Sequence, residues 1–219
     1  MKFQTSLAIV CLGSVSVLSG GAGAQTPPTH HHDFVDAAKW AGVFDDPARD
    51  EWQKPHEVIQ ALELAPDATV ADIGSGTGYF TVRLSHFVPE GRVYGVDIAP
   101  DMVKYLSERA AKSGLQNITA VTGQFDDPML PAPVDRVLLV DTYHHIDNRA
   151  DYFAHLRASL KPAGRVAIID FNTLSPVGPP VADRLLPAQV TSEMEAAGYR
   201  LLQRHDFLPN QYFMVFTPK

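Results

Sequence analysis

The run from Asp72 to Phe80, which reads DIGSGTGYF, is the segment best suited to bind a ligand through its backbone. Glycines turn tightly and allow a ligand to approach the main chain closely. A helix that starts after such a loop presents free N–H groups and the positive end of its dipole. In the dinucleotide fingerprint G-x-G-x-x-G, this arrangement holds a pyrophosphate. Here the third glycine, Gly78, comes one residue early and Asp72 precedes the first, so we expect a ligand that carries an ammonium group.

A second acidic residue, Asp97, ends the apolar segment RVYGVD that begins at Arg92. It follows the first glycine, Gly74, by about 20 residues, the distance at which an acidic residue can accept hydrogen bonds from both hydroxyls of a ribose. A ribose contact is therefore the favoured interpretation over an ordinary aspartate at the end of a strand.

The residues Asp141-Thr142-Tyr143-His144-His145 could support acid–base chemistry. The ordinary pKa of histidine lies near neutrality, so either histidine could remove a proton from an acceptor oxygen or nitrogen. We expect a catalytic role for at least one of them, with His144 slightly ahead. The alternative is that they cap the following helix or pack beneath it. Tyr143 is a weaker candidate that shapes the pocket.

Alternating strand and helix patterns must position these clusters. Strand patterns buried on both faces predict a Rossmann-like, doubly wound α/β sheet that is mostly parallel. The last two of seven strands are linked too briefly for a parallel crossover and predict a C-terminal antiparallel hairpin. Ligands bind such sheets beyond the C-terminal ends of the strands, so all three clusters should face one crevice. We expect strands at 69–73, 92–97, 117–122, 134–141, 165–170, 199–206 and 211–217, helices at 56–64, 77–87, 100–113, 149–160 and 190–197, and a turn at 161–164.

Together these motifs resemble those of class I S-adenosylmethionine-dependent methyltransferases that act on small molecules. DIGSGTGYF matches the first motif of that family and VYGVDI the second, and the resemblance covers roughly residues 58–216. It implies S-adenosylmethionine as the cofactor and transfer of its methyl group to a small-molecule acceptor by in-line displacement. The glycine spacing and the edge hairpin argue against a nicotinamide-dependent oxidoreductase.

The resemblance also implies which residues contact the cofactor. The glycine loop would hold the methionine part, Asp97 the ribose, and Ile98 the adenine. The family usually has a glycine and then an acidic residue after the third strand, but here the acidic residue is displaced. The adenine contact could be Asp126 or Asp127, with Phe125 on the ring, although either aspartate could instead be a turn residue before Pro128. The implied contacts are Asp72, Gly74, Ser75, Gly76, Gly78, Asp97, Ile98, Met102, Phe125, Asp126 and Asp141.

Composition and the absence of certain motifs argue against several other chemistries. The formal net charge of -7 disfavours nucleic acid as a partner, and no Asn/Asp-Pro-Pro-aromatic segment typical of DNA methylation follows the fourth strand. The only cysteine is Cys11, so a chain that starts at Gln25 has no thiolate for arsenite chemistry. His30-His31-His32 is expected to be a polar tract rather than a metal site, and no metal is expected.

The first residues predict an export signal. Leu7 to Leu18 has the length of a signal-peptide apolar region, and Ala22-Gly23-Ala24 matches a cleavage site, so we expect cleavage after Ala24 and a periplasmic or secreted protein. An uncleaved anchor is the alternative, and the mature chain has no further spanning segment. The predicted parts are a signal peptide at 1–24, a linker and helical arm at 25–55, and a methyltransferase domain at 56–219.

Export motivates a second hypothesis for function, because S-adenosylmethionine is made in the cytoplasm. An exported domain could bind S-adenosylmethionine or S-adenosylhomocysteine without transferring a methyl group. Within the arm, Trp40 and Trp52 are expected to be packing residues rather than an aromatic substrate box. Beyond the fifth strand, Asp170 and the Pro/Gly-rich segment 172–183 could shape the acceptor pocket. The sequence does not indicate the oligomeric state.

Overall fold

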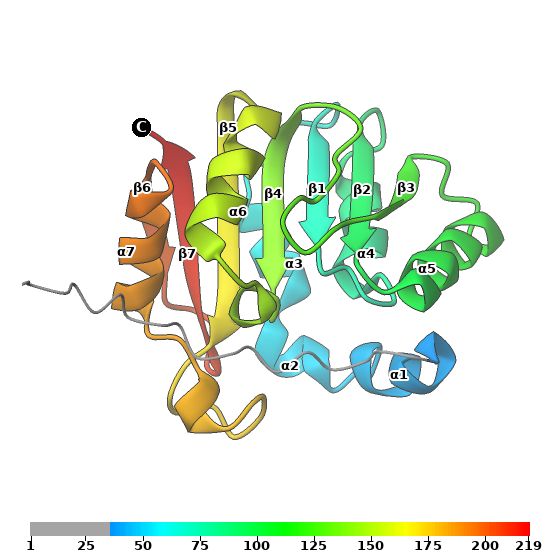
Figure 1. The fold of residues 1–219 in the computed structure, drawn as a ribbon. Helices are drawn as coiled ribbons and strands as arrows, with labels where there is room; N and C mark the ends of the chain where they lie inside the picture. The colour runs from blue at the N-terminus through cyan, green and yellow to red at the C-terminus, as the bar shows by residue number, and fades with distance from the viewer. Residues whose placement is uncertain (1–35) are drawn as a thin grey trace, which may run out of the picture.

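A computed structural model describes residues 36–219. Seven strands form one sheet in the order β3-β2-β1-β4-β5-β7-β6 (Figure 1). The first five strands of the chain pair in parallel, whereas β7 runs antiparallel to both β5 and β6. This confirms the Rossmann-like fold class and the C-terminal hairpin. The strands are β1 (Thr69–Ile73), β2 (Arg92–Asp97), β3 (Ile118–Thr122), β4 (Val134–Val140), β5 (Leu160–Phe171), β6 (Tyr199–His205) and β7 (Gln211–Pro218).

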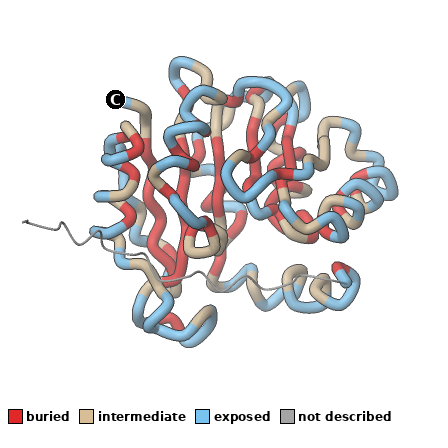
Figure 2. Tube along the Cα trace, in the orientation of Figure 1, coloured by how far each residue is buried: buried red, intermediate tan, exposed pale blue. Residues whose placement is uncertain are grey.

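Successive side chains along a strand point to opposite faces of the sheet. Apolar side chains point to both faces here, so helices cover both of them. Leu138 on β4 packs in the cluster formed with α3 and α4, whereas its neighbours Val137 and Leu139 pack in the cluster formed with α6 and α7. All three are buried, which explains the continuous apolar strand patterns, and Figure 2 shows the buried sheet between more exposed helices. The helices that flank the sheet are α3 (Pro55–Ala61), α4 (Tyr79–Phe87), α5 (Pro100–Lys112), α6 (Arg149–Leu156) and α7 (Pro187–Ala196).

The predicted boundaries are wrong around the start of β5. The helix expected at 149–160 ends at Leu156 and continues as a short 3-10 helix, Arg157–Ser159, before β5 begins at Leu160. The turn expected at 161–164 lies within β5, where the pairing with β4 jumps from Leu160 to Arg165. Residues 161–164 therefore leave the regular ladder as a turn would, although they are part of the strand.

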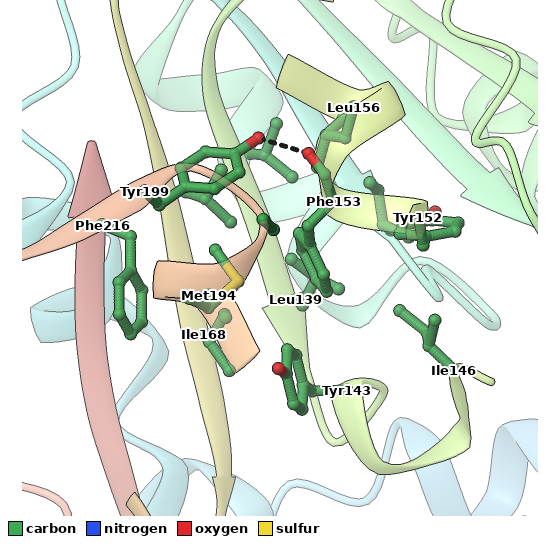
Figure 3. Packing of buried hydrophobic residues seen from close by; sticks show 14 of the residues in the cluster. Leu139, Tyr143, Ile146, Tyr152, Phe153, Leu156, Ile168, Met194, Tyr199 and Phe216 are labelled. Carbon is green, nitrogen blue, oxygen red and sulfur yellow. Dashed lines mark hydrogen bonds between the residues drawn. The ribbon is translucent and has the colours of Figure 1, made fainter. Parts of the chain in front are cut away.

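On the face covered by α6 and α7, the side chain of Tyr143 is buried among aromatic rings (Figure 3). Tyr143 stacks on Phe153 with ring centroids 5.2 Å apart, and its hydroxyl donates to Glu193 on α7 at 2.8 Å. Arg149 on α6 donates from Nε to the same carboxylate oxygen at 2.7 Å. The paired charge of Glu193 ties α6, α7 and the end of β4 together.

The arm before α3 forms two short helices, α1 (Ala37–Phe44) and α2 (Arg49–Gln53), beside the C-terminal ends of the strands (Figure 1). Ion pairs attach the arm to two helices that flank the sheet. Asp45 Oδ1 lies 2.8 Å from Arg109 Nη1 on α5, and Asp50 Oδ1 lies 3.0 Å from Arg83 Nη2 on α4. No helix between residues 36 and 219 is long and apolar enough to cross a membrane. The predicted signal peptide and the histidine tract at 30–32 lie outside the described residues.

Candidate active site

A cavity of about 1170 Å³ lies between the arm and the C-terminal ends of β1, β2 and β4. Its wall includes the glycine loop, the ends of these strands, residues of α1 and α2, and the segment after β5. Ligand pockets usually have volumes of about 300–1,000 Å³. The cavity is therefore large enough for a cofactor and a second molecule beside it.

The glycine loop follows β1 in a conformation that side chains disfavour. Gly74, Gly76 and Gly78 have φ angles of 74°, 52° and 93°. The N–H groups of Gly74 and Ser75 both donate to the Val96 carbonyl, at 2.8 and 2.9 Å, which fixes the loop to the end of β2. The hydroxyl oxygens of Ser75 and Thr77 are buried on the cavity wall without a hydrogen-bond partner among the described residues. Buried hydroxyls without partners fit a site that a polar ligand completes.

Gly74 gives the first testable prediction, since a Cβ there would lie 2.1 Å from Thr142 Oγ1. Gly74→Ala combines a strained positive φ with this clash, and we expect it to lower the free energy of unfolding by about 3 kcal/mol or more. Gly114→Ala is the matched control, because Gly114 has a φ of 68° but nothing within 4 Å of its Cβ position. It should lose only the strain, about 1–2 kcal/mol. Urea unfolding of both variants measures the difference, and equal stability would contradict the close approach of Thr142 to the loop.

Two predicted acidic contacts lie at the ends of β1 and β2. The Asp97 carboxylate accepts from the N–H of Gly76 at 2.8 Å and from the N–H of Ala99 at 2.9 Å. Asp72 is buried and accepts from the Thr81 hydroxyl at 2.6 Å, and its burial raises its pKa to about 6. Both residues line the cavity. Asp97 thus joins the glycine loop to the start of α5 at the point where a ribose contact is expected.

The predicted adenine contacts separate into two groups. Ile98, Met102 and Phe125 line the cavity. Asp126 is exposed and does not line it. The Asp127 carboxylate accepts from the Met129 N–H at 2.7 Å, and its carbonyl accepts from the Gln124 N–H at 2.7 Å. The structure therefore favours the turn interpretation of these aspartates over an adenine contact.

His144 lies on the cavity wall beside a buried carboxylate that the sequence did not assign to it. Its Nδ1 is 2.9 Å from both carboxylate oxygens of Asp170, at the end of β5, and its backbone N–H donates to Asp170 Oδ2 at 3.2 Å. An Nδ1–H that donates to this carboxylate leaves Nε2 free to accept a proton. Burial lowers the pKa of His144, but the hydrogen bond and charge of Asp170 outweigh burial and raise the pKa above 6.5. This is the arrangement of a general base held by an orienting acid.

The other two residues of the histidine cluster lie differently. The ring of His145 also lines the cavity, with its centroid 4.1 Å from that of His144. Tyr143 is fully buried among the core residues (Figure 3) and does not line the cavity. Its hydroxyl donates to Glu193. The structure therefore places Tyr143 in the core rather than on the cavity wall, and its hydroxyl stabilises the packing of α7.

Asp141 directly follows β4 and lies on the cavity wall in a left-handed conformation, with a φ of 55°. Its carboxylate accepts from Gln211 Nε2 at 2.6 Å and from Gln53 Nε2 at 3.2 Å. Burial, followed by the nearby charge of Asp170, raises the pKa of Asp141 to about 7. This carboxyl is therefore only partly ionised near neutral pH.

The arm supplies wall residues that sequence reasoning missed. Arg49 and Trp52 on α2 both line the cavity, and Trp52 lies 6.2 Å from the ring of Phe171. Trp40 stacks on Phe44 at 5.4 Å, which agrees with a packing role. The expectation that Trp52 only packs the arm is therefore incomplete. No pattern in the sequence of this short segment linked it to the glycine loop.

Comparison with known proteins gives the same class as the fold and the site. A family model described as "Methyltransferase domain" matches residues 64–211, more than half of the chain, so the chain belongs to this methyltransferase family. A solved S-adenosylmethionine-dependent methyltransferase from Aquifex aeolicus superposes with a TM-score of 0.76 and 28% identity, covering 83% of this chain and 97% of that one. That solved relative is described as S-adenosylmethionine dependent, so S-adenosylmethionine is the cofactor that the family and the fold indicate for this chain.

Curated relatives match only parts of their own length. The arsenite methyltransferase of Halobacterium salinarum is 31% identical over 115 residues, which are 52% of this chain and 29% of that protein. The demethylmenaquinone methyltransferase of Listeria monocytogenes serotype 4a is 28% identical over 124 residues, which are 55% of this chain and 51% of that protein. The chain spans about half of the length of these relatives or less, so the matches do not show which molecule it methylates.

Proposed function

We propose that this enzyme methylates an oxygen or nitrogen atom of a small, largely apolar acceptor, with His144 as the general base and Asp170 as its orienting partner. The observation that carries the proposal is His144, which lies on the wall of the cavity with its Nδ1 2.9 Å from the carboxylate of Asp170. When bound, S-adenosylmethionine supplies a methyl group on a positively charged sulfur, which is a good leaving group. His144 takes the proton of the acceptor atom as that atom forms its new bond to carbon.

The rest of the wall favours an apolar acceptor. Trp52, Phe171, Val177, Pro179 and Pro180 line the cavity on the side of the segment that follows β5. Apolar walls exclude water and leave the few polar groups to orient the substrate. A quinol or another hydroxylated ring would match such a wall, and the relative named demethylmenaquinone methyltransferase supports a quinone-like class of acceptor. The net charge of -7 supports a small molecule over nucleic acid.

Export after cleavage at Ala24 is part of the proposal, and it favours one alternative function. Residues 7–18 and the Ala22-Gly23-Ala24 site support an exported protein, whose cofactor has to be supplied outside the cytoplasm. The alternative is an exported domain that holds S-adenosylmethionine or S-adenosylhomocysteine without methyl transfer.

Turnover with a panel of acceptors separates these two functions. The full chain is incubated with S-adenosylmethionine and a quinol, a phenol, an aliphatic amine or arsenite with a thiol, and S-adenosylhomocysteine is measured by mass spectrometry. We expect product with the hydroxylated rings and none with arsenite, because the single cysteine, Cys11, lies in the predicted signal. Tight cofactor binding without turnover of any acceptor would favour the binding domain.

A further inference from the structure

The charges on the cavity wall are unbalanced. Asp46, Asp72, Asp97, Asp101 and Asp141 line it, whereas Arg49 is the one arginine or lysine on the wall in the described part of the chain. The methionine part of the cofactor carries both an ammonium group and a carboxylate. The acidic residues suit the ammonium group and the ribose hydroxyls, but they repel the carboxylate.

We propose that Arg49, on helix α2 of the arm, binds the carboxylate of the methionine part of the cofactor. The proposal rests on the placement of the cofactor in this cavity. Arg49 precedes residues 64–211, which the family model matches, so the family assignment itself gives it no role. It would make the arm a part of the cofactor site rather than only a cover over it.

The guanidinium of Arg49 is held in place and still has donors to offer. Its Nε donates to Gln53 Oε1 at 2.9 Å, Nη2 donates to the same oxygen, and Nη1 donates to the Phe44 carbonyl. Its charge lies over the ring of Tyr79, 4.2 Å from the centroid. Arginine carries five N–H donors, so these contacts use three and orient the group without saturating it.

The nearest acid is a poor partner for Arg49. Asp141 Oδ2 lies 4.0 Å from Nη2, which is beyond hydrogen-bond distance, and this carboxylate already accepts from Gln53 and Gln211. Because the pKa of Asp141 is about 7, its negative charge is only partial near neutral pH. The Arg49 side chain is only 17% exposed, and a largely buried cation without a fully charged, hydrogen-bonded partner is costly. A ligand carboxylate would relieve this cost by a charge-assisted, two-point contact.

Gln53 is the positioning residue of this arrangement. It is fully buried, and its side chain connects Arg49 through Oε1 to Asp141 through Nε2. The arm and the end of β4 are thereby linked at the cavity wall. Arg49 consequently reaches the wall in one orientation although α2 has only five residues.

Two ligands that differ in the amino-acid part test the proposal. S-adenosylhomocysteine carries the carboxylate, whereas 5′-methylthioadenosine keeps the nucleoside and lacks the whole amino-acid part. Calorimetric titration of the full chain should show that Arg49→Met weakens S-adenosylhomocysteine about 10- to 100-fold, the loss expected for a hydrogen-bonded charge pair. The affinity for 5′-methylthioadenosine should change by less than about 3-fold. Arg49→Lys, which keeps the charge but not the fork of donors, should fall between Arg49→Met and the unchanged chain.

Arg83 offers a matched control for the structural effect of losing an arginine. It lies over the same Tyr79 ring at 4.0 Å and pairs with Asp50 of the arm, but it does not line the cavity. Arg83→Met should leave both affinities within about 3-fold of the unchanged chain. Equal losses for both ligands in Arg49→Met, or no loss for S-adenosylhomocysteine, would overturn the proposal. If the unchanged chain binds neither ligand, the cofactor placement fails instead.

Discussion

Replacing Asp97 by alanine is expected to weaken S-adenosylhomocysteine binding by about 100-fold or more, because a ribose would lose two hydrogen bonds to a charged acceptor. Asp97 also holds the glycine loop through the Gly76 N–H and the start of α5 through the Ala99 N–H. The loss should therefore include a less ordered loop as well as the missing ribose contact. Calorimetric titration measures the affinity, and a thermal melt reports whether the variant is folded.

Asp126→Ala is the matched control for this loss. The sequence left Asp126 open as an adenine contact, but the side chain is exposed and away from the cavity. Its removal should change the affinity by less than about 3-fold. An unchanged affinity in Asp97→Ala, or a comparable loss in Asp126→Ala, would contradict the position of the ribose proposed for this site.

Replacing His144 by alanine is expected to lower kcat by about 10²- to 10⁴-fold, the usual contribution of a general base. The affinity for S-adenosylhomocysteine should stay within about 3-fold, because His144 is assigned to the acceptor and not to the cofactor. Steady-state kinetics with an acceptor found in the panel measures kcat. His86→Ala serves as the control, since His86 is exposed on α4 and should leave kcat unchanged. A small loss of kcat in His144→Ala would show that methyl transfer does not depend on this base.

The pH dependence of kcat has a definite sign. A general base has to be unprotonated, so kcat should rise with pH through an apparent pKa above 6.5, the ordinary value for histidine, because Asp170 stabilises the protonated ring of His144. Asp170→Asn removes that charge, so the rise should move to lower pH while the plateau of kcat falls because the ring is less well oriented. A rise that stays in place in Asp170→Asn would contradict the pairing of the two residues.

Much of the fold follows from local patterns in the sequence. The apolar strands that end at Ile73 and Asp97 were predicted with the bounds that the structure has, because burial on both faces leaves an uninterrupted apolar signal. The region around Leu160 was mispredicted, because residues 161–164 have turn chemistry but lie between two paired parts of β5. The turn propensity of these residues does not indicate that the strand continues and pairs with β4 again from Arg165 onward.

The candidate site was predictable where one short segment carries the chemistry. The glycine loop directly follows β1 and Asp97 ends β2, so the resemblance assigns both from short local segments. The pairing of His144 with Asp170 depends on β4 and β5 being neighbours, which only the sheet order shows. The segment Tyr143–His145 forms a 3-10 helix with about three residues per turn, so its side chains point in different directions. Tyr143 therefore points into the core while the two histidines lie on the cavity wall.

The contribution of the arm was the least predictable part of the site. Arg49 and Trp52 belong to a helix of five residues, which is too short to show a helical period. Their place on the cavity wall arises from long-range contacts, such as the hydrogen bond from Gln53 to Asp141. Contacts of this kind join residues far apart in the sequence and leave no local pattern.

Calorimetric titration of the full chain with S-adenosylhomocysteine, beside an identical titration with NADH, tests the central claim most directly. The cavity with the glycine loop, Asp72 and Asp97 predicts micromolar or tighter binding of S-adenosylhomocysteine at a single site and no measurable binding of NADH. Binding of NADH in place of S-adenosylhomocysteine, or no binding by a chain shown to be folded, would contradict the assignment of this cavity as the cofactor site.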